Sequence, residues 1–561
     1  MDVSEMQRKL SQWAAEDPTK RFVDLYNLLC NEAWLRVAHH AVNTNQGRET
    51  AGIDSETMSH FNGNLDGNLE ALRRLLKTKS FEPQPVRRVY IPKTNGKKRP
   101  LGIPGIRDRI VQEALRMILE PIWEADFSRH SYGFRPNRST YDAMTYIGKR
   151  LAGNGGEKYQ WVIEGDIASY FDTIPHRRLI KAVKKRVADR HIRDLLWKFL
   201  RAGVMHREKR YETLTGTPQG GIVSPLVANI YLHDLDKYME SAYLALSPWQ
   251  RGQRRAQGKG NFLYVRYADD FVVLCNGTKA EALAMKEELK AFLGTKGLTL
   301  SEEKTKVTHI TEGFTFLGYR IIRSIGTKGK MIPKVLIPAE AIKRFRYKVR
   351  EILARRSTSE SVNAKMTALN QLIQGWCEYY RCTNSPSVIF NSLNPAVFWG
   401  MAHWLGRKYK RNMPEIMRRF SQGNTFQTAT RKLRMPSDYK AKRFVAKTWH
   451  NPYTEKEEVR KEQRRLQRES FFSYDRTWSG NEGGRPGKMD LREEVILRDG
   501  PTCVHGGKTC HPSEGQVDHK IPRARFKDPT DADRLKNYQV LCTTCHRAKT
   551  KTDLKVLSRM R

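Results

Sequence analysis

The chain has 561 residues, of which 101 are Lys or Arg and 60 are Asp or Glu, giving a formal net charge of +41. A chain of this length favours about three or four domains, and the charge favours a polyanion as partner, because neutralising phosphates releases their counterions. A solvated basic surface or binding to an anionic membrane is the alternative, but no apolar stretch is long enough to span a bilayer, which argues against an integral membrane protein.

The chain starts with a polar segment that resembles neither a secretory signal nor a transit peptide, so an intracellular, cytoplasmic protein is expected. Up to about Leu76 the pattern predicts helices with a glycine-bearing loop at residues 43–54. Residues 86–101 then predict a hairpin, because the Asn95-Gly96 pair is typical of a tight turn between two strands. Basic side chains are expected near its tip.

Two further elements are predicted before the middle of the chain. Residues 161–163 indicate a strand that runs into Asp166. Before it, a helix is expected whose apolar residues form one stripe: Val111, Leu115, Ile118 and Ile122.

The centre of the chain contains a short acidic break between two β-rich runs. The runs cover residues 262–266 and 271–274, and between them stands Tyr267-Ala268-Asp269-Asp270. This pattern predicts a hairpin with two carboxylates at its tip. A glycine-rich turn that opens an apolar helix is expected before it, over residues 218–236, and another helix after it, over residues 279–293.

The carboxy-terminal part of the chain is more basic. Residues 341 to about 420 predict basic helices, and from about 431 to 470 the chain is dense in Lys and Arg with little periodic apolar content. The second stretch indicates a nucleic-acid-contacting segment or a linker. Residues 479–487, rich in glycine, predict a flexible joint before a small module that contains Cys and His.

The acidic residues at the strand ends indicate a metal site. Adjacent carboxylates repel and are costly to bury without a counter-charge, and carboxylate oxygens suit Mg²⁺. Brought together, Asp166 and Asp269 can hold two metals, one activating a primer hydroxyl and one neutralising a triphosphate. Taken singly, Asp166 is equally consistent with a cap on the following turn, and Asp270 with a solvated hairpin acid.

The eight cysteines fall into two groups. Four are scattered among helical or strand-like sequence, as buried reduced thiols are: Cys30, Cys275, Cys377 and Cys382. The other four cluster among histidines near the end of the chain, which in an intracellular protein favours a metal site over disulfides: Cys503, Cys510, Cys542 and Cys545. Four thiolates would close a structural Zn²⁺ site.

The order of motifs resembles that of a reverse transcriptase, specifically the protein encoded by bacterial and organellar group II introns. No motif suffices alone, but the ordered set is specific and runs over nearly the whole chain. The motifs are at residues 91–104, 131–136, 165–172, 217–226, 267–270, 297–305 and 316–319. The resemblance implies a right-hand polymerase with fingers, palm and thumb, and a bacterial cytoplasm or nucleoid as location.

The resemblance assigns roles in a polymerase site. Asp166, Asp269 and Asp270 become the Mg²⁺-binding carboxylates of the palm, with Asp269 the expected direct ligand and Asp270 partly structural. Phe171 matches the aromatic steric gate, whose ring occupies the space that a ribonucleotide 2′-OH needs; the alternative is an ordinary core Phe.

Three more residues are expected to contact the incoming deoxynucleotide. Gln219 would lie beneath it, with glycines beside it that permit close backbone approach. Lys93 and Arg99, on the predicted hairpin at residues 86–101, would contact the triphosphate.

Residues 371–381 resemble the maturase region of the family, which doubles as the polymerase thumb. Basic residues with interleaved aromatics suit RNA. Trp376, Tyr379 and Tyr380 stand at helical spacing, so we expect them to form a core stripe while outward Lys and Arg bind RNA. The implied partner is the intron's own RNA, which would itself carry the splicing chemistry.

The terminal module resembles an HNH endonuclease with a ββα-metal site. By that resemblance His519 is the general base that activates water, and Asn537 helps to place it. Asp518 and His546 would bind the catalytic divalent ion. A zinc ribbon that only binds DNA is the alternative.

One spacing in the terminal module departs from the family. Six residues separate Cys503 from Cys510, where the family has a tight pair. His505 or His511 is therefore an alternative zinc ligand to one of them.

Together these features predict a multidomain α+β protein of four parts. They are fingers and palm at residues 1–340, a helical thumb or maturase domain at 341–430, a basic DNA-binding segment and linker at 431–485, and a zinc-stabilised HNH module at 486–561. Such a protein would copy RNA into DNA from deoxynucleotides, assist intron splicing, and nick target DNA to prime reverse transcription during intron mobility.

Two alternatives share part of this pattern. The first is a domesticated reverse transcriptase of another class, which the joint presence of maturase-like helices and HNH residues disfavours. The second is an RNA-binding splicing chaperone with vestigial sites, which the intact acidic and histidine residues disfavour.

Overall fold

The computed structural model describes residues 2–92, 98–152, 159–206, 209–217, 220–326, 331–442, 449, 451–453, 505, 516–521, 537–541 and 543–558. The chain forms two compact units that are considered separately. The first unit contains residues 1–346, 376–392 and 439–455. The second contains residues 347–375, 393–438 and 456–561.

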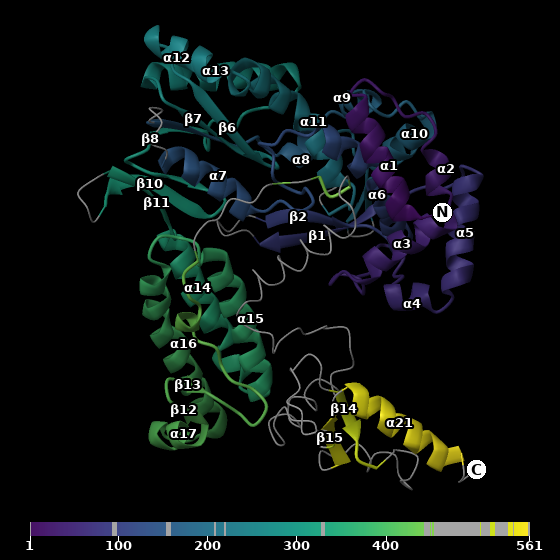
Figure 1. Cartoon of the computed structure of the whole chain (residues 1–561), viewed down its shortest axis with the longest axis vertical. Coiled ribbons are helices and arrows are strands. Elements are labelled where there is room, and N and C mark those ends of the chain that lie inside the picture. Colours follow the sequence, from purple (N-terminus) through teal and green to yellow (C-terminus); the bar gives the residue numbers. More distant parts are fainter. Residues whose placement is uncertain are drawn as a thin grey trace. The chain divides into compact units, whose positions relative to one another are not determined.

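Helices form the start of the first unit, as the sequence predicts (Figure 1). They are α1 (Val3–Glu16), α2 (Tyr26–Leu29), α3 (Glu32–Asn43), α4 (Met58–Asn62) and α5 (Leu65–Lys77). α1, α2 and α3 pack against α6 (Ile106–Asp126), with α1 and α3 in the most extensive contact, while α5 contacts α3 and α4. The indole of Trp34, which has no exposed surface, donates to the carbonyl of Ala114 at 3.0 Å.

Helix α6 is buried almost all round, whereas the sequence predicted one apolar stripe. The predicted stripe residues are buried, but so are acidic residues on other faces, among them Glu113, Glu120 and Glu124. Arg116 pairs with the first two, at 2.7 and 2.5 Å. Such pairs allow a helix with charged positions to lie inside a fold, because buried charge is tolerated when it is paired.

A four-stranded antiparallel sheet lies at the centre of the first unit, in the order β6-β7-β3-β8. The strands are β3 (Trp161–Gly165), β6 (Phe262–Tyr267), β7 (Asp270–Cys275) and β8 (Lys306–His309). In Figure 1, α13 (Lys279–Thr295) lies on one side of these strands and α7 (Thr140–Ala152) on the other. The predicted hairpin and the strand before Asp166 are both confirmed.

A second sheet has the order β2-β1-β4-β5. Its strands are β1 (Val86–Pro92), β2 (Lys98–Ile103), β4 (Val204–His206) and β5 (Lys209–Tyr211). β1 and β2 are antiparallel, with Arg87 opposite Ile103 and Pro92 opposite Lys98, which confirms the predicted hairpin. Its tip, with Lys93, lies outside the described residues.

The remaining elements of the first unit surround these sheets. The helices are α8 (Tyr170–Thr173), α9 (His176–Lys184), α10 (Arg190–Arg201), α11 (Ser224–Met239), the π-helical turn η1 (Glu240–Leu244) and α12 (Pro248–Ala256). A three-stranded sheet in the order β11-β10-β9 was not foreseen from the sequence. Its strands are β9 (Phe314–Phe316), β10 (Tyr319–Ile325) and β11 (Met331–Leu336).

The basic helical region predicted after residue 340 is confirmed. It comprises α14 (Ala339–Ile352), η2 (Arg355–Ser357), α15 (Val362–Tyr380), α16 (Pro386–Tyr409), α17 (Met413–Phe420), β12 (Ser421–Gln422), β13 (Thr425–Phe426) and η3 (Pro436–Asp438). In the second unit, Leu369 and Ile373 of α15 and Val397 of α16 are fully buried. The indole of Trp404 donates to the hydroxyl of Ser357 at 3.3 Å.

Near the end of the chain, the described residues include two strands and a helix. β14 (Gln516–His519) and β15 (Tyr538–Leu541) are antiparallel, and α21 (Thr543–Ser558) contacts both. This is the ββα order expected for the terminal module. Across the described residues, no helix has both the length and the apolar composition to cross a membrane.

Candidate active sites

The backbone of the Tyr-Ala-Asp-Asp turn is hydrogen-bonded to a buried arginine. Tyr267 ends β6 and pairs with Asp270, which begins β7. Between them, Ala268 has a left-handed conformation with φ of +58°. Arg266, which has no exposed surface, donates to the carbonyl of Ala268 at 2.8 Å. The same guanidinium pairs with Asp236 at 2.5 Å, where neither side chain is exposed. The backbone of the turn is therefore anchored to a buried ion pair.

The loop at residues 130–136 packs against this turn. Arg266 donates its backbone N–H to the carbonyl of His130, and Tyr132 donates to the carbonyl of Arg266, both at 2.9 Å. A Cβ on Gly133 would lie 2.4 Å from the backbone nitrogen of Ala268, so only glycine fits there without a shift. The second motif of the sequence thus supports the acidic turn.

Strand pairing brings the predicted acidic residues to one end of the central sheet. Gly165 lies opposite Phe271, so Asp166 follows β3 where Asp270 begins β7. Burial raises the pKa of Asp270 to about 6, and repulsion from Asp269 and Asp166 adds to it. Burial also raises the pKa of Asp269, and repulsion from Asp166 contributes.

Two cations face these carboxylates. The Lys304 ammonium lies 2.9 Å from Asp166, and this hydrogen bond raises the lysine's pKa. Arg99, exposed on β2, is close enough to favour the ionised form of Asp269. Three carboxylates therefore lie close enough to repel one another, and a bound cation would reduce this repulsion.

The donor set fits a hard divalent cation, because it consists of carboxylate oxygens. Among the described residues, no group of three or more His, Cys, Asp or Glu side chains is arranged so that it could hold a metal ion. That is compatible with Mg²⁺, which commonly takes one or two carboxylates and completes its shell with water and substrate phosphates.

Phe171 lies on α8 beside the loop that contains the glycine-rich motif. Only 9% of its surface is exposed, and its carbonyl accepts from the backbone of Thr217 at 2.6 Å. The ring of Phe134 stands edge-on to it, with centroids 6.4 Å apart. Phe134 is 54% exposed and has φ of +56°, which is rare for a bulky residue. Sequence reasoning missed Phe134, although it lies inside a quoted motif.

The glycine-rich loop closely approaches strand β2. A Cβ on Gly220 would lie 2.3 Å from the carbonyl oxygen of Gly102, and Gly220 has φ of +110°. Both observations require glycine at this position. The adjacent Gln219 lies outside the described residues.

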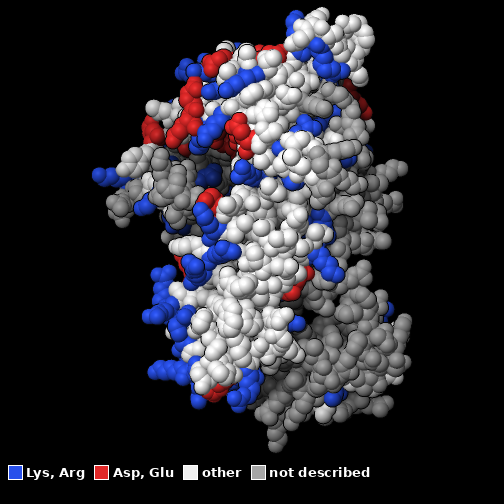
Figure 2. Space-filling view, turned by 90° about the vertical axis from the view of Figure 1, so that its left-hand side faces the viewer, with Lys and Arg blue, Asp and Glu red and all other residues white. Residues whose placement is uncertain are grey.

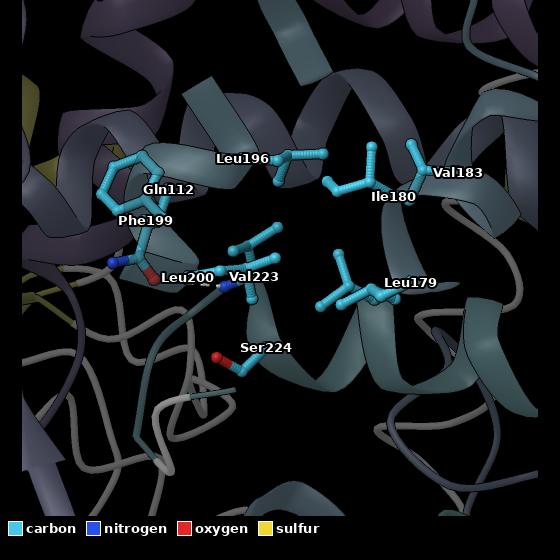
Figure 3. Close-up of a pocket in the computed structure, with 10 residues that line it drawn as sticks. Gln112, Leu179, Ile180, Val183, Leu196, Phe199, Leu200, Val223 and Ser224 are labelled. Atoms are coloured by element: carbon cyan, nitrogen blue, oxygen red, sulfur yellow. Dashed lines mark hydrogen bonds between the residues drawn. The ribbon is translucent and has the colours of Figure 1, made fainter. Parts of the chain in front are cut away.

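A small cavity nearby is part of the core and not a substrate site. In Figure 3 its apolar side chains, among them Leu179, Val183 and Leu196, point toward one another. Its volume of about 10 Å³ is at the lower limit for one water molecule.

The predicted aromatic stripe of the maturase-like region has a structural role. Tyr380 is buried and donates to the carbonyl of Gly318 at 3.1 Å, while Tyr379 donates to that of Leu317 at 2.5 Å. Tyr379 also stacks on Tyr319 with centroids 4.9 Å apart, although 37% of it is exposed. Trp376 packs on Tyr380, with centroids 4.8 Å apart.

Basic side chains lie on the outside of α14. Phe345 and Val349 are 1% exposed and form its inner face. Figure 2 shows Lys and Arg gathered along one edge of the part where the helices from α14 to α17 lie. The exposed cations of α14 are Lys343, Arg344, Arg346, Lys348 and Arg350.

In the terminal module, described contacts join the helix and the strands. Lys549 on α21 lies 3.2 Å from Asp518 on β14. The Asn537 side chain accepts from the backbone N–H of Ile521 and donates to its carbonyl, both at 3.0 Å. His546 lies near the start of α21. His519 pairs through its backbone with Tyr538.

Most of the predicted zinc site cannot be placed. Cys503, Cys510, Cys542 and His511 lie outside the described residues, as does the side chain of His519. Cys545 is half-buried, and His505 is exposed.

Comparison with known proteins identifies three successive regions. The reverse transcriptase (RNA-dependent DNA polymerase) family matches residues 91–321, the group II intron maturase-specific domain 342–421, and the HNH endonuclease family 503–552. The chain is 43% identical to Protein YkfC of Escherichia coli, over 62% of this chain and 95% of that protein.

A second relative is the group II intron-encoded protein LtrA of Lactococcus lactis. It is 32% identical over 489 residues, which cover 74% of this chain and 80% of LtrA. A third relative, named nuclear intron maturase 2, mitochondrial, of Arabidopsis thaliana, is 26% identical over 59% of this chain and 55% of that protein. The chain therefore belongs to the group II intron-encoded proteins and unites a reverse transcriptase, a maturase domain and an HNH endonuclease in one polypeptide.

Proposed function

We propose that RNA is copied into DNA at the Tyr-Ala-Asp-Asp turn, with Asp166 and Asp269 as Mg²⁺ ligands and Asp270 supporting them. The observation that carries this proposal is the pairing of β3 with β7, which gathers these acids at one sheet end. When bound, Mg²⁺ supplies the charge that activates the primer 3′-hydroxyl and neutralises the triphosphate.

The surrounding residues act directly on the carboxylates and the nucleotide. Lys304 holds the Asp166 carboxylate in place at 2.9 Å. Arg99, Lys93 and Gln219 bind the incoming deoxynucleotide, the first two at its phosphates. The position of Arg99 is supported by its electrostatic effect on Asp269.

Phe171 selects deoxynucleotides in this proposal. Its ring fills the space that a 2′-OH would need, and its support from α8 and the Thr217 backbone keeps the ring in place. The fingers, palm and thumb of a right-hand polymerase are then formed by the second sheet, the central sheet and the helices after residue 340.

The maturase helices bind the intron RNA through their outer cations. The basic face of α14 supports this, because exposed Lys and Arg neutralise phosphates while the aromatic residues are occupied in packing. The RNA performs the splicing chemistry, and the protein stabilises its active fold.

The HNH module nicks one strand of target DNA, and the resulting 3′-OH primes reverse transcription. His519 acts as general base, and Asn537 positions the chain next to it through its contacts with Ile521. Asp518 and His546 would hold a divalent ion, which when bound would supply positive charge to the scissile phosphate. Structural Zn²⁺ is held by Cys503, Cys510, Cys542 and Cys545.

Replacement of Asp269 tests the polymerase site. Asp269→Ala should lower RNA-templated DNA synthesis by roughly 10³-fold or more, as loss of charge neutralisation does in phosphoryl transfer, while intron RNA binding stays intact. Primer extension on an RNA template and an RNA-binding titration measure both. Asp172→Asn, which changes an exposed acid on α8, is the matched control and should behave as wild type. Normal synthesis by Asp269→Ala would refute the assignment.

A further inference from the structure

A short segment beyond the maturase region belongs to the first unit. Trp449, Asn451 and Tyr453, here called the anchor residues, lie outside the three regions matched by known families. The sequence predicted a DNA-binding segment and linker at residues 431–485. The anchor residues of this segment contact α1, α6 and the loop that supports the acidic turn.

The Trp449 ring lies over two arginines of that loop, the buried Arg135 and the half-buried Arg138. Its ring centre is 4.1 Å from the guanidinium carbon of Arg138 and 5.2 Å from that of Arg135. The Nε and Nη2 atoms of Arg138 are buried without a hydrogen-bond partner. Burial and the neighbouring Arg135 lower the pKa of Arg138 to about 9. The indole face offers this cation an attraction that replaces lost hydration.

The Tyr453 side chain lies among charged residues of α6. Its hydroxyl donates to Glu120 at 2.5 Å, and Glu120 also pairs with Arg116 at 2.5 Å. Burial raises the pKa of Tyr453 far above its usual value, so the phenol stays neutral and remains a donor. Asn451 adds a hydrogen bond of 3.0 Å to the hydroxyl of Ser11, which is fully buried on α1.

The loop under Trp449 leads directly to the catalytic turn. Arg135 pairs with Glu124 at 2.8 Å, with neither side chain exposed, and donates to the carbonyl of Ser131 at 2.8 Å. The next residues are Tyr132, bonded to Arg266, and Gly133, packed on Ala268. A shift of Arg135 would therefore be transmitted to the turn within a few contacts.

We propose that Trp449 and Tyr453 are positioning residues of the polymerase: they clamp the loop at residues 130–138 and α6, and thereby fix the Tyr-Ala-Asp-Asp turn. This inference rests on the proposed polymerase site. It makes a segment beyond the maturase domain part of the reverse transcriptase, although that segment lies outside the matched reverse transcriptase region.

The test uses the full-length chain with single replacements. Trp449→Ala should lower kcat for RNA-templated DNA synthesis about 10- to 100-fold, as displacement of reacting groups by ~1 Å does, while the affinity for primer–template is unchanged. Trp449→Phe, which keeps an aromatic face, should recover most of the rate. Tyr453→Phe, which removes only the hydroxyl, should lower kcat less. Trp249→Ala, at an indole that is 71% exposed on α12, is the matched control.

Hydrogen exchange separates positioning from general destabilisation. In Trp449→Ala, amides at residues 130–138 should exchange faster, while those of α3 and α5 keep their wild-type rates. If Trp449→Ala copies RNA at the wild-type rate, or if exchange rises equally throughout the unit, the proposal is overturned. Activity in Asp269→Ala would overturn the proposed site itself, so the two failures are distinguishable.

Discussion

Asp270 shows how the polymerase site retains an unfavourable charge. Its pKa is raised to about 6 by burial and by the carboxylates of Asp269 and Asp166, and Lys304 offsets this only in part. A fold selected for stability alone would avoid three acids at one sheet end. Functional sites commonly keep such strain, because the charge is useful when a substrate and a cation arrive.

This charge predicts a stabilising substitution. A carboxyl whose pKa is raised on folding destabilises the folded state once ionised, so the penalty is fully present well above pH 6. It fades as the pH falls from 6 toward the usual 3.8. Because Asp270 is also exposed on one side, Asp270→Asn should gain only about 1 kcal/mol at pH 7.5.

Thermal unfolding in metal-free buffer checks this, with wild type and Asp270→Asn compared at pH 7.5 and pH 5. The gain should be clearly smaller at pH 5. An equal gain at both values, or a loss, would contradict the electrostatic cause.

At the scale of elements, the acidic turn depends on a neighbouring loop as much as on its own hairpin. The carbonyl of Gly133 accepts from Asn229 at 2.8 Å, and Asn229 also accepts from Arg266 at 2.8 Å. The loop, helix α11 and the hairpin therefore share one buried polar network. Such networks fix a single geometry when every member is paired.

A methyl group at Gly133 tests this coupling. Gly133→Ala places a Cβ 2.4 Å from the backbone nitrogen of Ala268, so the loop or the turn must move. We expect polymerisation to fall about 10²-fold, the cost of a small misplacement of reacting groups, with circular dichroism unchanged. Gly148→Ala is the control, because nothing lies within 4 Å of its Cβ. Equal activity of the two variants would show that the close contact does not matter.

Local patterns predicted those elements whose signal lies within a few residues. The hairpin around Asp269 and the strand before Asp166 follow from short β-rich apolar runs that end at acidic residues, and both are confirmed. The sheet at residues 314–336 was missed, and Pro333 inside β11 weakens its strand pattern.

Contacts between distant segments could not be derived from the sequence. Trp449 and Tyr453 follow a run of Lys and Arg, yet their partners are more than 300 residues earlier in the chain. The exposure and strained backbone of Phe134 depend on the packing of its neighbours in the same way.

The whole molecule combines two sites for nucleic-acid chemistry in one basic chain. The net charge of +41 serves RNA and DNA alike, so charge alone does not separate the two activities. Separation comes from ligand chemistry instead. In the proposed sites, the polymerase would use carboxylates at the end of a sheet, whereas the HNH module would use an acid and imidazoles.

Because the sites are built independently, their activities should be separable by mutation. His519→Ala should abolish nicking of target DNA, because the proposed general base that accepts a proton from water is lost, while cDNA synthesis and zinc content stay at wild-type values. Asp269→Ala should show the reverse pattern.

Cys542→Ser should lower zinc content and nicking together, since a small module with little core depends on its metal. One preparation of each ribonucleoprotein, assayed for strand nicking, for extension of a supplied primer and for bound zinc, decides this. If His519→Ala still nicks DNA, the general base is another residue. If it stops extension of the supplied primer, the two sites are coupled.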